Sequence, residues 1–213
     1  MRHKLYIFDL DGTILDTLTD LWNAVNYTMR KFAYPTLEKG EVADRTGNGI
    51  ARLVKSSLPS DVSEDVQRHA LATFKEYYVE HCADNTKPYE HIKDVIATLK
   101  NGGAKCAVIS NKADEAVQKL AREYFGNLFD VVVGQKDGVR QKPYPDEVES
   151  VIKELGVKRE DAVYIGDSEV DVQTANNARM DLVAVSWGFR GRARLEECGA
   201  KVIIDSPEQI LEY

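Results

Sequence analysis

The sequence predicts an α/β protein whose mainly parallel sheet carries a long helical insertion. Three observations support this fold class. Short apolar runs recur along the chain as buried strands would, helical patterns separate most of them, and one interval from about residue 15 to residue 88 has no strand-like run. Strands that alternate with helices form parallel sheets whose two faces are both covered.

The expected strands run from the N-terminal region to the end of the chain. They lie at 5–8, 106–109, 131–133, 162–165, 182–185 and 202–204, and helical patterns lie at 113–124, 146–155 and 170–178. In such a sheet, ligands bind beyond the C-terminal ends of the strands. The polar residues that follow these strands are therefore the first candidates for a functional site.

The interval that breaks the alternation is expected to form a helical subdomain. Its first apolar residues recur at helical spacing and are interpreted as the core-facing stripe of a helix: Leu18, Leu21, Trp22, Val25, Met29 and Phe32. We expect an α/β core of residues 1–14 and 89–213 and a helical cap subdomain of residues 15–88. Pro88 and the Gly102–Gly103 pair mark the return to the sheet.

Composition narrows the functional class. The chain has 213 residues, 43% of them hydrophobic and 30% charged, and a formal net charge of -7. This balance is typical of a soluble domain and disfavours general nucleic-acid binding, because nucleic-acid phosphates repel an acidic chain. Cys82, Cys106 and Cys198 form no CxxC pair, which disfavours a zinc site or disulfide framework and suggests the reducing cytoplasm. The apolar run near the N-terminus is too short for a signal peptide or membrane span, so no membrane association is expected.

Two carboxylates follow the first expected strand. Asp9 and Asp11 are two residues apart and share a face if the chain stays extended, while Gly12 permits a tight turn before Thr13. Two ionised carboxylates this close repel each other, so a proton or a divalent cation must compensate. The alternative is a solvated turn at the end of a strand.

Three later strand ends or turns supply complementary groups. Ser110 and Asn111 can donate hydrogen bonds to phosphate oxygens, and Lys142 can supply a positive charge. Asp167 and Asp171 are spaced by one helical turn, and carboxylate oxygens are ligands that Mg²⁺ prefers. Taken singly, Ser110–Asn111 is more often a helix N-cap and Lys142 more often a surface lysine, while Asp167 could equally be a helix N-cap. Together, at one edge of a parallel sheet, they predict a site for a divalent cation and a phosphoryl group.

The four motifs resemble those of the haloacid dehalogenase superfamily and occur in the same order. They are Asp9-x-Asp11-Gly12-Thr13, Ser110-Asn111, Lys142-Pro143 and Gly166-Asp167-x3-Asp171. The helical insertion is similar to the type 1 cap of that superfamily, on a Rossmann-like core. Within it the chain most resembles the phosphoglycolate phosphatase branch, on Thr46-Gly47-Asn48-Gly49 in the cap and Trp187-Gly188-Phe189-Arg190 after the fifth core strand. It departs from the pattern at Arg179 and Glu90-His91, where relatives often carry glycine and Pro-Gly.

This resemblance implies a Mg²⁺-dependent phosphatase that acts on a small phosphorylated metabolite. Asp9 would be the nucleophile and Asp11 the general acid and base. Mg²⁺ would bind Asp9, the Asp11 carbonyl and Asp167, and Asp171 would support the metal or Lys142. The phosphoryl oxygens would be held by Thr13, Ser110, Asn111 and Lys142, and the leaving group selected by Gly47, Asn48 and Gly49.

Other interpretations stay open at this level. A sugar phosphomutase keeps the same motifs, although mutases that resemble this chain usually carry valine at the position of Thr13. A nucleotidase or a pyrophosphatase would use the same chemistry. A phospho-acceptor signalling module also clusters aspartates near a lysine, but it has no reason to carry a large insertion. A dehalogenase would not need an acid at Asp11. A phosphonate-cleaving enzyme would need an activated cap lysine, and nothing in the sequence marks one.

Overall fold

The computed structural model describes residues 2–213 and divides the chain into two compact units. One unit, here called the core, consists of two segments of the chain: the first ends at Asp16 and the second begins at Pro88. The other unit is Thr17–Lys87. The sequence placed the corresponding boundaries at residues 15 and 88, within two residues of this division.

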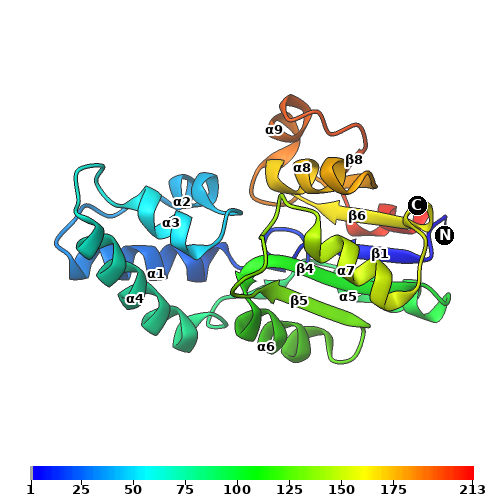
Figure 1. The fold of residues 1–213 in the computed structure, drawn as a ribbon, viewed down its shortest axis with the longest axis horizontal. Coiled ribbons are helices and arrows are strands. Elements are labelled where there is room, and N and C mark those ends of the chain that lie inside the picture. Colours follow the sequence, from blue (N-terminus) through cyan, green and yellow to red (C-terminus); the bar gives the residue numbers. More distant parts are fainter. Residues whose placement is uncertain (1) are drawn as a thin grey trace. The chain divides into compact units, whose positions relative to one another are not determined.

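A parallel sheet is the centre of the core (Figure 1). In the described part of the chain it has six strands in the order β5-β4-β1-β6-β7-β8. Their bounds are β1 Leu5–Phe8, β4 Lys105–Ala113, β5 Val131–Gln135, β6 Ala162–Gly166, β7 Asp181–Val185 and β8 Ile203–Ile204. All neighbouring pairs are parallel, so the C-terminal ends of the strands lie at one edge.

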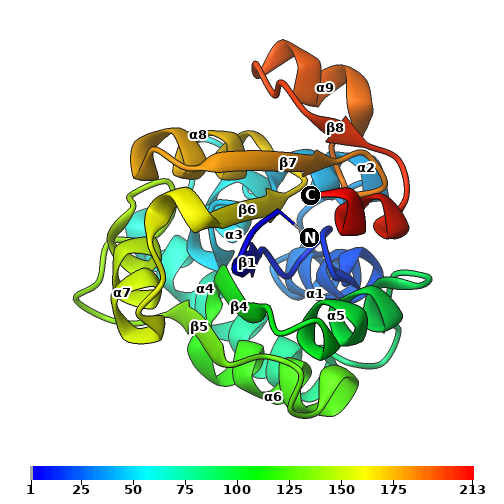
Figure 2. The same cartoon turned by 90° about the vertical axis from the view of Figure 1, so that its right-hand side faces the viewer.

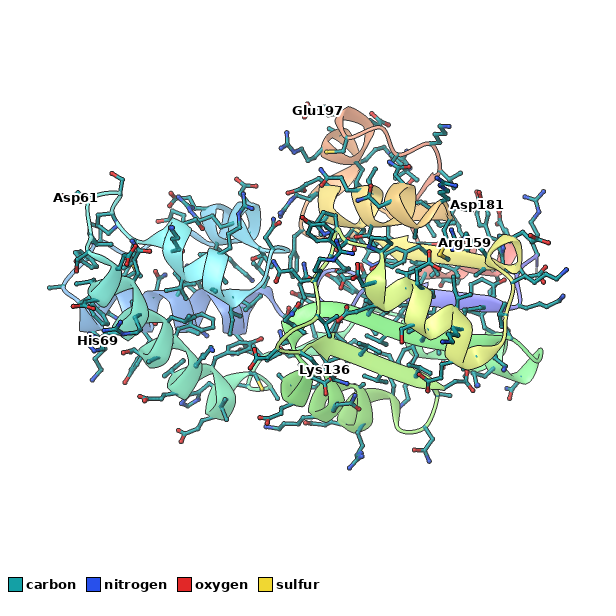
Figure 3. The ribbon with its side chains drawn as sticks, in the orientation of Figure 1. Asp61, His69, Lys136, Arg159, Asp181 and Glu197 are labelled. Carbon is teal, nitrogen blue, oxygen red and sulfur yellow. The ribbon has the colours of Figure 1, made fainter. Side chains whose placement is uncertain are left out.

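Helices cover both faces of this sheet (Figure 2). The core helices are α5 Ile92–Asn101, α6 Asp114–Phe125, α7 Asp146–Leu155, α8 Glu169–Ala178 and α9 Gly191–Glu197, with short 3₁₀ turns at Arg159–Asp161 and Pro207–Glu212. Leu5 and Ile7 of β1 belong to the buried cluster formed with α7 and α8. The next residues along β1 point to the opposite face, where Phe8 contacts Phe129 edge-on. Figure 3 shows side chains filling the space between the sheet and these helices.

The Thr17–Lys87 unit is helical. It consists of α1 Leu18–Lys31, α2 Lys39–Arg45, α3 Ile50–Ser57 and α4 Glu64–His81. Leu21, Val25 and Met29 of α1 are buried, as their helical spacing predicts. After α4, the backbone N–H groups of Asn85 and Thr86 donate to the buried carboxylate of Asp20 at 2.8–3.0 Å, which fastens the end of the unit to its first helix.

The interval 15–88 does contain strand, contrary to the expectation from sequence. Leu15–Asp16 (β2) and Lys87–Pro88 (β3) form a two-stranded pair where the chain leaves and re-enters the core. Two-residue strands are too short to produce an alternating pattern, so no sequence signal marks them. Among the described helices, none combines the length and the apolar character needed to cross a bilayer.

Candidate active site

Strand register brings three of the four motifs to one edge of the sheet. Phe8, the last residue of β1, pairs with Val108 of β4 and with Ile165 of β6. Asp9 therefore emerges between Ser110–Asn111 on one side and Asp167 on the other. These residues meet because the sheet is parallel, as the alternation of strands and helices predicts, so that its strands all end at one edge.

Lys142 joins this group from the loop before α7. Its Nζ lies 2.9 Å from Asp9 Oδ1 and 2.8 Å from Asp171 Oδ1, and it donates to Tyr164 Oη at 3.1 Å. The Lys142 side chain is 2% exposed. Burial disfavours its charged form, but Asp171 and Asp9 outweigh that cost and hold the pKa of Lys142 well above its ordinary value. The lysine is therefore a fixed positive charge beside Asp9.

Asn111 fixes the backbone of Lys142. Its Oδ1 accepts from the Lys142 N–H at 2.8 Å and its Nδ2 donates to the Lys142 carbonyl at 3.0 Å. This two-point contact explains how a loop lysine is aimed inward rather than into solvent. The Asn111 side chain has this bond to Lys142 in addition to its predicted role at the phosphoryl oxygens.

Asp167 follows β6 and is held through both of its oxygens. Oδ1 accepts from Thr13 Oγ1 at 3.1 Å, and Oδ2 accepts from the Phe189 backbone N–H at 2.7 Å. Asp171, on the first turn of α8, is also held at both oxygens, because Oδ2 accepts from the Ser168 hydroxyl at 2.6 Å while Oδ1 faces Lys142. Asp171 thus supports Lys142 directly.

Three buried carboxylates of this site could hold a metal ion. Single oxygens of Asp9, Asp167 and Asp171 all lie within 4.8 Å of one another. Burial raises the pKa of Asp9 to about 7; Lys142 opposes this shift, and the carboxylates of Asp171 and Asp11 add to it. Burial, with help from Asp171 and Asp9, likewise holds the pKa of Asp167 well above its ordinary range. Excess buried negative charge on oxygen donors fits a hard divalent cation such as Mg²⁺.

Asp11 has a cationic partner that the sequence did not suggest. Lys112 Nζ lies 2.8 Å from Asp11 Oδ1, and the Lys112 side chain is 2% exposed. The pairing of β4 with β5 is irregular between Ile109 and Ala113, and the Lys112 N–H donates to Ser110 Oγ at 3.2 Å. Such an irregularity re-aims side chains at the end of a strand. A charged residue at the end of an apolar run was the signal that could have revealed Lys112.

Tyr164 and Trp187 are two further residues of the site that motif reasoning missed. Tyr164 is fully buried on β6 and accepts from Lys142. Trp187 donates from Nε1 to the Thr13 carbonyl at 3.0 Å. In the sequence Tyr164 cannot be told from an ordinary core residue. Trp187 is marked only because its segment resembles the one that follows the fifth core strand in the phosphoglycolate phosphatases.

The predicted cap-loop residues lie in the Thr17–Lys87 unit. Gly47, Asn48 and Gly49 connect α2 to α3, and both glycines have positive φ, 106° and 80°. Thr46 ends α2 and its hydroxyl donates to the Val42 carbonyl at 2.8 Å. These values describe a tight glycine-dependent turn between two short helices.

Comparison with known proteins agrees with the motifs. The family model of the haloacid dehalogenase-like hydrolases matches residues 6–185. Phosphoglycolate phosphatase 1 of Pseudomonas aeruginosa is 32% identical over 98% of this chain and 78% of its own length. The pyrophosphatase PpaX of Bacillus cereus is 27% identical over 99% of this chain and 96% of its own length.

The fold has solved counterparts as well. A provisionally named phosphoglycolate phosphatase from Lactobacillus delbrueckii subsp. bulgaricus has a crystal structure that superposes with a TM-score of 0.94 at 39% identity, covering 100% of this chain and 98% of its own. The match to the family model, the relatives and the converging aspartates all lead to one assignment. The chain belongs to the haloacid dehalogenase-like hydrolases and is a phosphatase that resembles the phosphoglycolate phosphatases.

Proposed function

We propose that this protein hydrolyses a small phosphate monoester, with 2-phosphoglycolate as the leading substrate, through a phosphorylated Asp9 and with Mg²⁺ bound beside it. The observation that carries the proposal is the position of Asp9, which is buried, lies 2.9 Å from Lys142 and shares a carboxylate cluster with Asp167. A carboxylate in this setting is positioned to attack phosphorus.

The first half of the reaction would transfer the phosphoryl group to Asp9. An Asp9 oxygen forms a bond to phosphorus while the bond from phosphorus to the ester oxygen breaks, and Asp11 gives its proton to the leaving alkoxide. Lys142 and Ser110 would hold the phosphoryl oxygens, and Thr13 would keep Asp167 oriented. Asp9 and Asp167 would hold Mg²⁺, which when bound stabilises the negative charge of the transferring group.

The second half would regenerate the enzyme. Asp11, now a carboxylate, takes a proton from water, whose oxygen attacks phosphorus as the bond to Asp9 breaks and inorganic phosphate leaves. Lys112 Nζ, 2.8 Å from Asp11 Oδ1, would hold the Asp11 side chain in place for both proton transfers. We assign Thr17–Lys87 the role of a cap, with Gly47, Asn48 and Gly49 selecting the leaving group.

Inorganic pyrophosphate is the second candidate substrate, because the Bacillus cereus relative carries the name pyrophosphatase. Both candidates are small anions, and cations of the site complement them.

We place the protein in the cytoplasm, since Cys82, Cys106 and Cys198 are all unpaired thiols.

The test is phosphate release from a panel of esters with Mg²⁺ or with EDTA. The panel contains 2-phosphoglycolate, pyrophosphate, AMP, glucose phosphates and p-nitrophenyl phosphate. We expect Mg²⁺-dependent release with one preferred substrate, and a loss of about 10³-fold or more in Asp9→Asn. Asp61→Asn, at an exposed position of the helical unit (Figure 3), is the matched control and should keep full activity. Undiminished turnover by Asp9→Asn would refute the nucleophile.

A further inference from the structure

The segment that follows β7 contacts two motifs at once. Trp187 donates from its indole Nε1 to the Thr13 carbonyl at 3.0 Å, and two residues later the Phe189 N–H donates to Asp167 Oδ2 at 2.7 Å. The segment thus spans the turn after β1 and the aspartate after β6. None of the four motifs includes it.

Gly188, between these two donors, leaves no space for a side chain. A Cβ placed on it would lie 2.3 Å from Asp167 Cβ, 2.4 Å from Asp167 Oδ2 and 2.4 Å from the Gly12 carbonyl oxygen. Distances this short require backbone or buried side-chain atoms to move. The requirement for glycine is therefore one of space, and it arises from direct packing against Asp167.

The contacts converge on the orientation of one carboxylate. Oδ2 of Asp167 is held by the Phe189 N–H, and Oδ1 is held by the hydroxyl of Thr13, whose carbonyl is in turn held by Trp187. Asp167 is buried near two other carboxylates, whose negative charges repel its own and favour its rotation away. The contacts from this segment oppose that rotation.

The segment is itself fixed at each end. The Trp187 ring packs at a tilt against Tyr89, with centroids 6.4 Å apart. Beyond Phe189, Arg190 Nε lies 2.7 Å from Glu169 Oε2, and its side chain is 4% exposed. A segment anchored on both sides can impose a position on Asp167 rather than follow it.

We propose that Trp187–Phe189 is a positioning segment that holds Asp167 ready for the metal ion: Trp187 acts through Thr13, Gly188 through contact and Phe189 through its N–H. This inference rests on the proposed function, because Asp167 is one of the residues that would hold Mg²⁺. Groups that orient a metal ligand in this way typically change metal affinity by about 10–100-fold.

The chain offers a matched pair of variants for the test. It has two tryptophans, and each donates its Nε1–H to a backbone carbonyl: Trp187 to Thr13 at 3.0 Å and Trp22 to Leu37 at 2.8 Å. Trp22 belongs to the helical unit, which contains none of the proposed metal ligands. Trp187→Phe and Trp22→Phe each remove one N–H donor and keep an aromatic ring, so each should lose a similar amount of stability from the missing hydrogen bond. Only Trp187 is linked to Asp167 through Thr13.

The measurement is calorimetric titration of the metal-free full-length proteins with MgCl₂, together with their thermal stability in EDTA. We expect Trp187→Phe to weaken Mg²⁺ binding roughly 10-fold and Gly188→Ala to weaken it further, while Trp22→Phe stays within about 2-fold of wild type. In Trp22→Phe, Trp187 is the sole tryptophan, and its emission should change with the same half-saturation as the heat signal.

Two outcomes would overturn the inference, and they are distinguishable. If wild type binds Mg²⁺ and Trp187→Phe binds it equally well, while both tryptophan variants lose similar stability, the segment is merely structural and the metal-dependent function stands. If wild type shows no Mg²⁺ binding, the proposed function fails and the inference with it. Should Gly188→Ala not fold, Trp187→Phe alone decides between these results.

Discussion

Lys142 balances the charge of several residues at once. Its ammonium group contacts Asp9 and Asp171, and Asn111 fixes its backbone. A buried lysine of this kind is stabilised only while its carboxylates remain, and each carboxylate depends on the lysine in the same way. The site is therefore a coupled group, and the effects of single substitutions within it should not add.

Asp11 carries the most specific prediction among the site residues. Asn at this position cannot transfer a proton, so Asp11→Asn should slow hydrolysis of an alkyl ester such as 2-phosphoglycolate by about 10²–10⁴-fold. A nitrophenolate leaves without protonation, so kcat/KM for p-nitrophenyl phosphate should fall much less. The measurement is kcat/KM for both esters in wild type and variant, because this ratio reports the first half of the reaction, whereas the loss of Asp11 as the base of the second half lowers kcat for both esters alike. Equal losses for the two esters would remove Asp11 from the acid role.

Some residues of the site could be predicted from the sequence and others could not, because different structural features place them there. Asp9 and Asp167 directly follow strands, so the rule that parallel strands end at one edge was enough to bring them together. Lys142 lies in the loop before α7, and its contact with Asn111 directs it to the same site. Lys112 reaches Asp11 only because β4 continues past its apolar run and becomes irregular, and Trp187 acts through an indole N–H directed at another strand's turn. Neither geometry leaves a periodic trace in sequence.

Among the elements, the strands match the prediction closely. The expected strand 5–8 is β1 without change, and 162–165 gains one residue in β6. The largest difference is β4, expected at 106–109 and observed as Lys105–Ala113, because its last residues are polar side chains of the site. Burial by α7 and other helices makes these strands continuously apolar, which is why short runs located them.

The turn between α2 and α3 is predicted to set substrate preference. Asn48 is flanked by Gly47 and Gly49, whose positive φ values give the turn a shape that depends on glycine. Asn48→Ala should raise KM or change the ranking of esters in the panel by about 10-fold, with p-nitrophenyl phosphate nearly unaffected, because a lost polar contact weakens only the substrate that makes it. Asn23→Ala on α1 is a control of equal chemistry. An unchanged ranking would leave this turn a plain connection between helices.

Two departures from the family pattern have a conformational consequence. Arg179 at the end of α8 and His91 before α5 have φ of 53° and 63°, a region that favours glycine. Arg179 is exposed. Arg179→Gly should therefore stabilise the fold by about 0.5–1 kcal/mol in urea unfolding monitored by circular dichroism.

The reciprocal control is Gly156→Ala at the end of α7. Gly156 has φ of 64°, and a methyl group at its Cβ position would meet no atom within 4 Å, so the substitution tests conformation alone. We expect a loss of about 1 kcal/mol. A destabilised Arg179→Gly would show that the arginine side chain contributes more than its backbone costs.

For the molecule as a whole, buried carboxylates set the pH dependence of stability. Glu147 in the first turn of α7 is 5% exposed, and neither of its carboxylate oxygens has a hydrogen-bond partner among the described residues. Burial raises the pKa of Glu147 to about 7, with Lys142 and Lys136 opposing and Asp114 and Asp146 adding to the shift. Lys136 follows β5 (Figure 3).

The direction of this pH dependence follows from the pH at which Glu147 releases its proton in the folded and in the unfolded protein. Unfolded, Glu147 ionises near 4.5, whereas folded it keeps its proton until about pH 7. The contribution of Glu147 to the free energy of unfolding is therefore fully present below pH 4.5. It is lost as the pH rises to about 7, and the loss amounts to up to about 3 kcal/mol. Asp9, whose pKa is also about 7, contributes in the same direction when the metal is absent.

Glu147→Gln should remove the part of this pH-dependent loss of stability that comes from Glu147, since an amide cannot ionise. In EDTA, the free energy of unfolding from urea titrations between pH 5 and pH 8 should fall less steeply in the variant, which becomes more stable than wild type at pH 8 by as much as about 3 kcal/mol. The matched control is Glu149→Gln, which removes the same charge from the same helix at a carboxylate paired with Arg159 and 44% exposed. Equal effects of the two substitutions would mean that general negative charge, and not the buried Glu147 carboxylate, governs the slope. Because Glu147 is not a proposed metal ligand, the stabilisation that Mg²⁺ adds at pH 8 should persist in Glu147→Gln, which separates its contribution from that of Asp9 and Asp167.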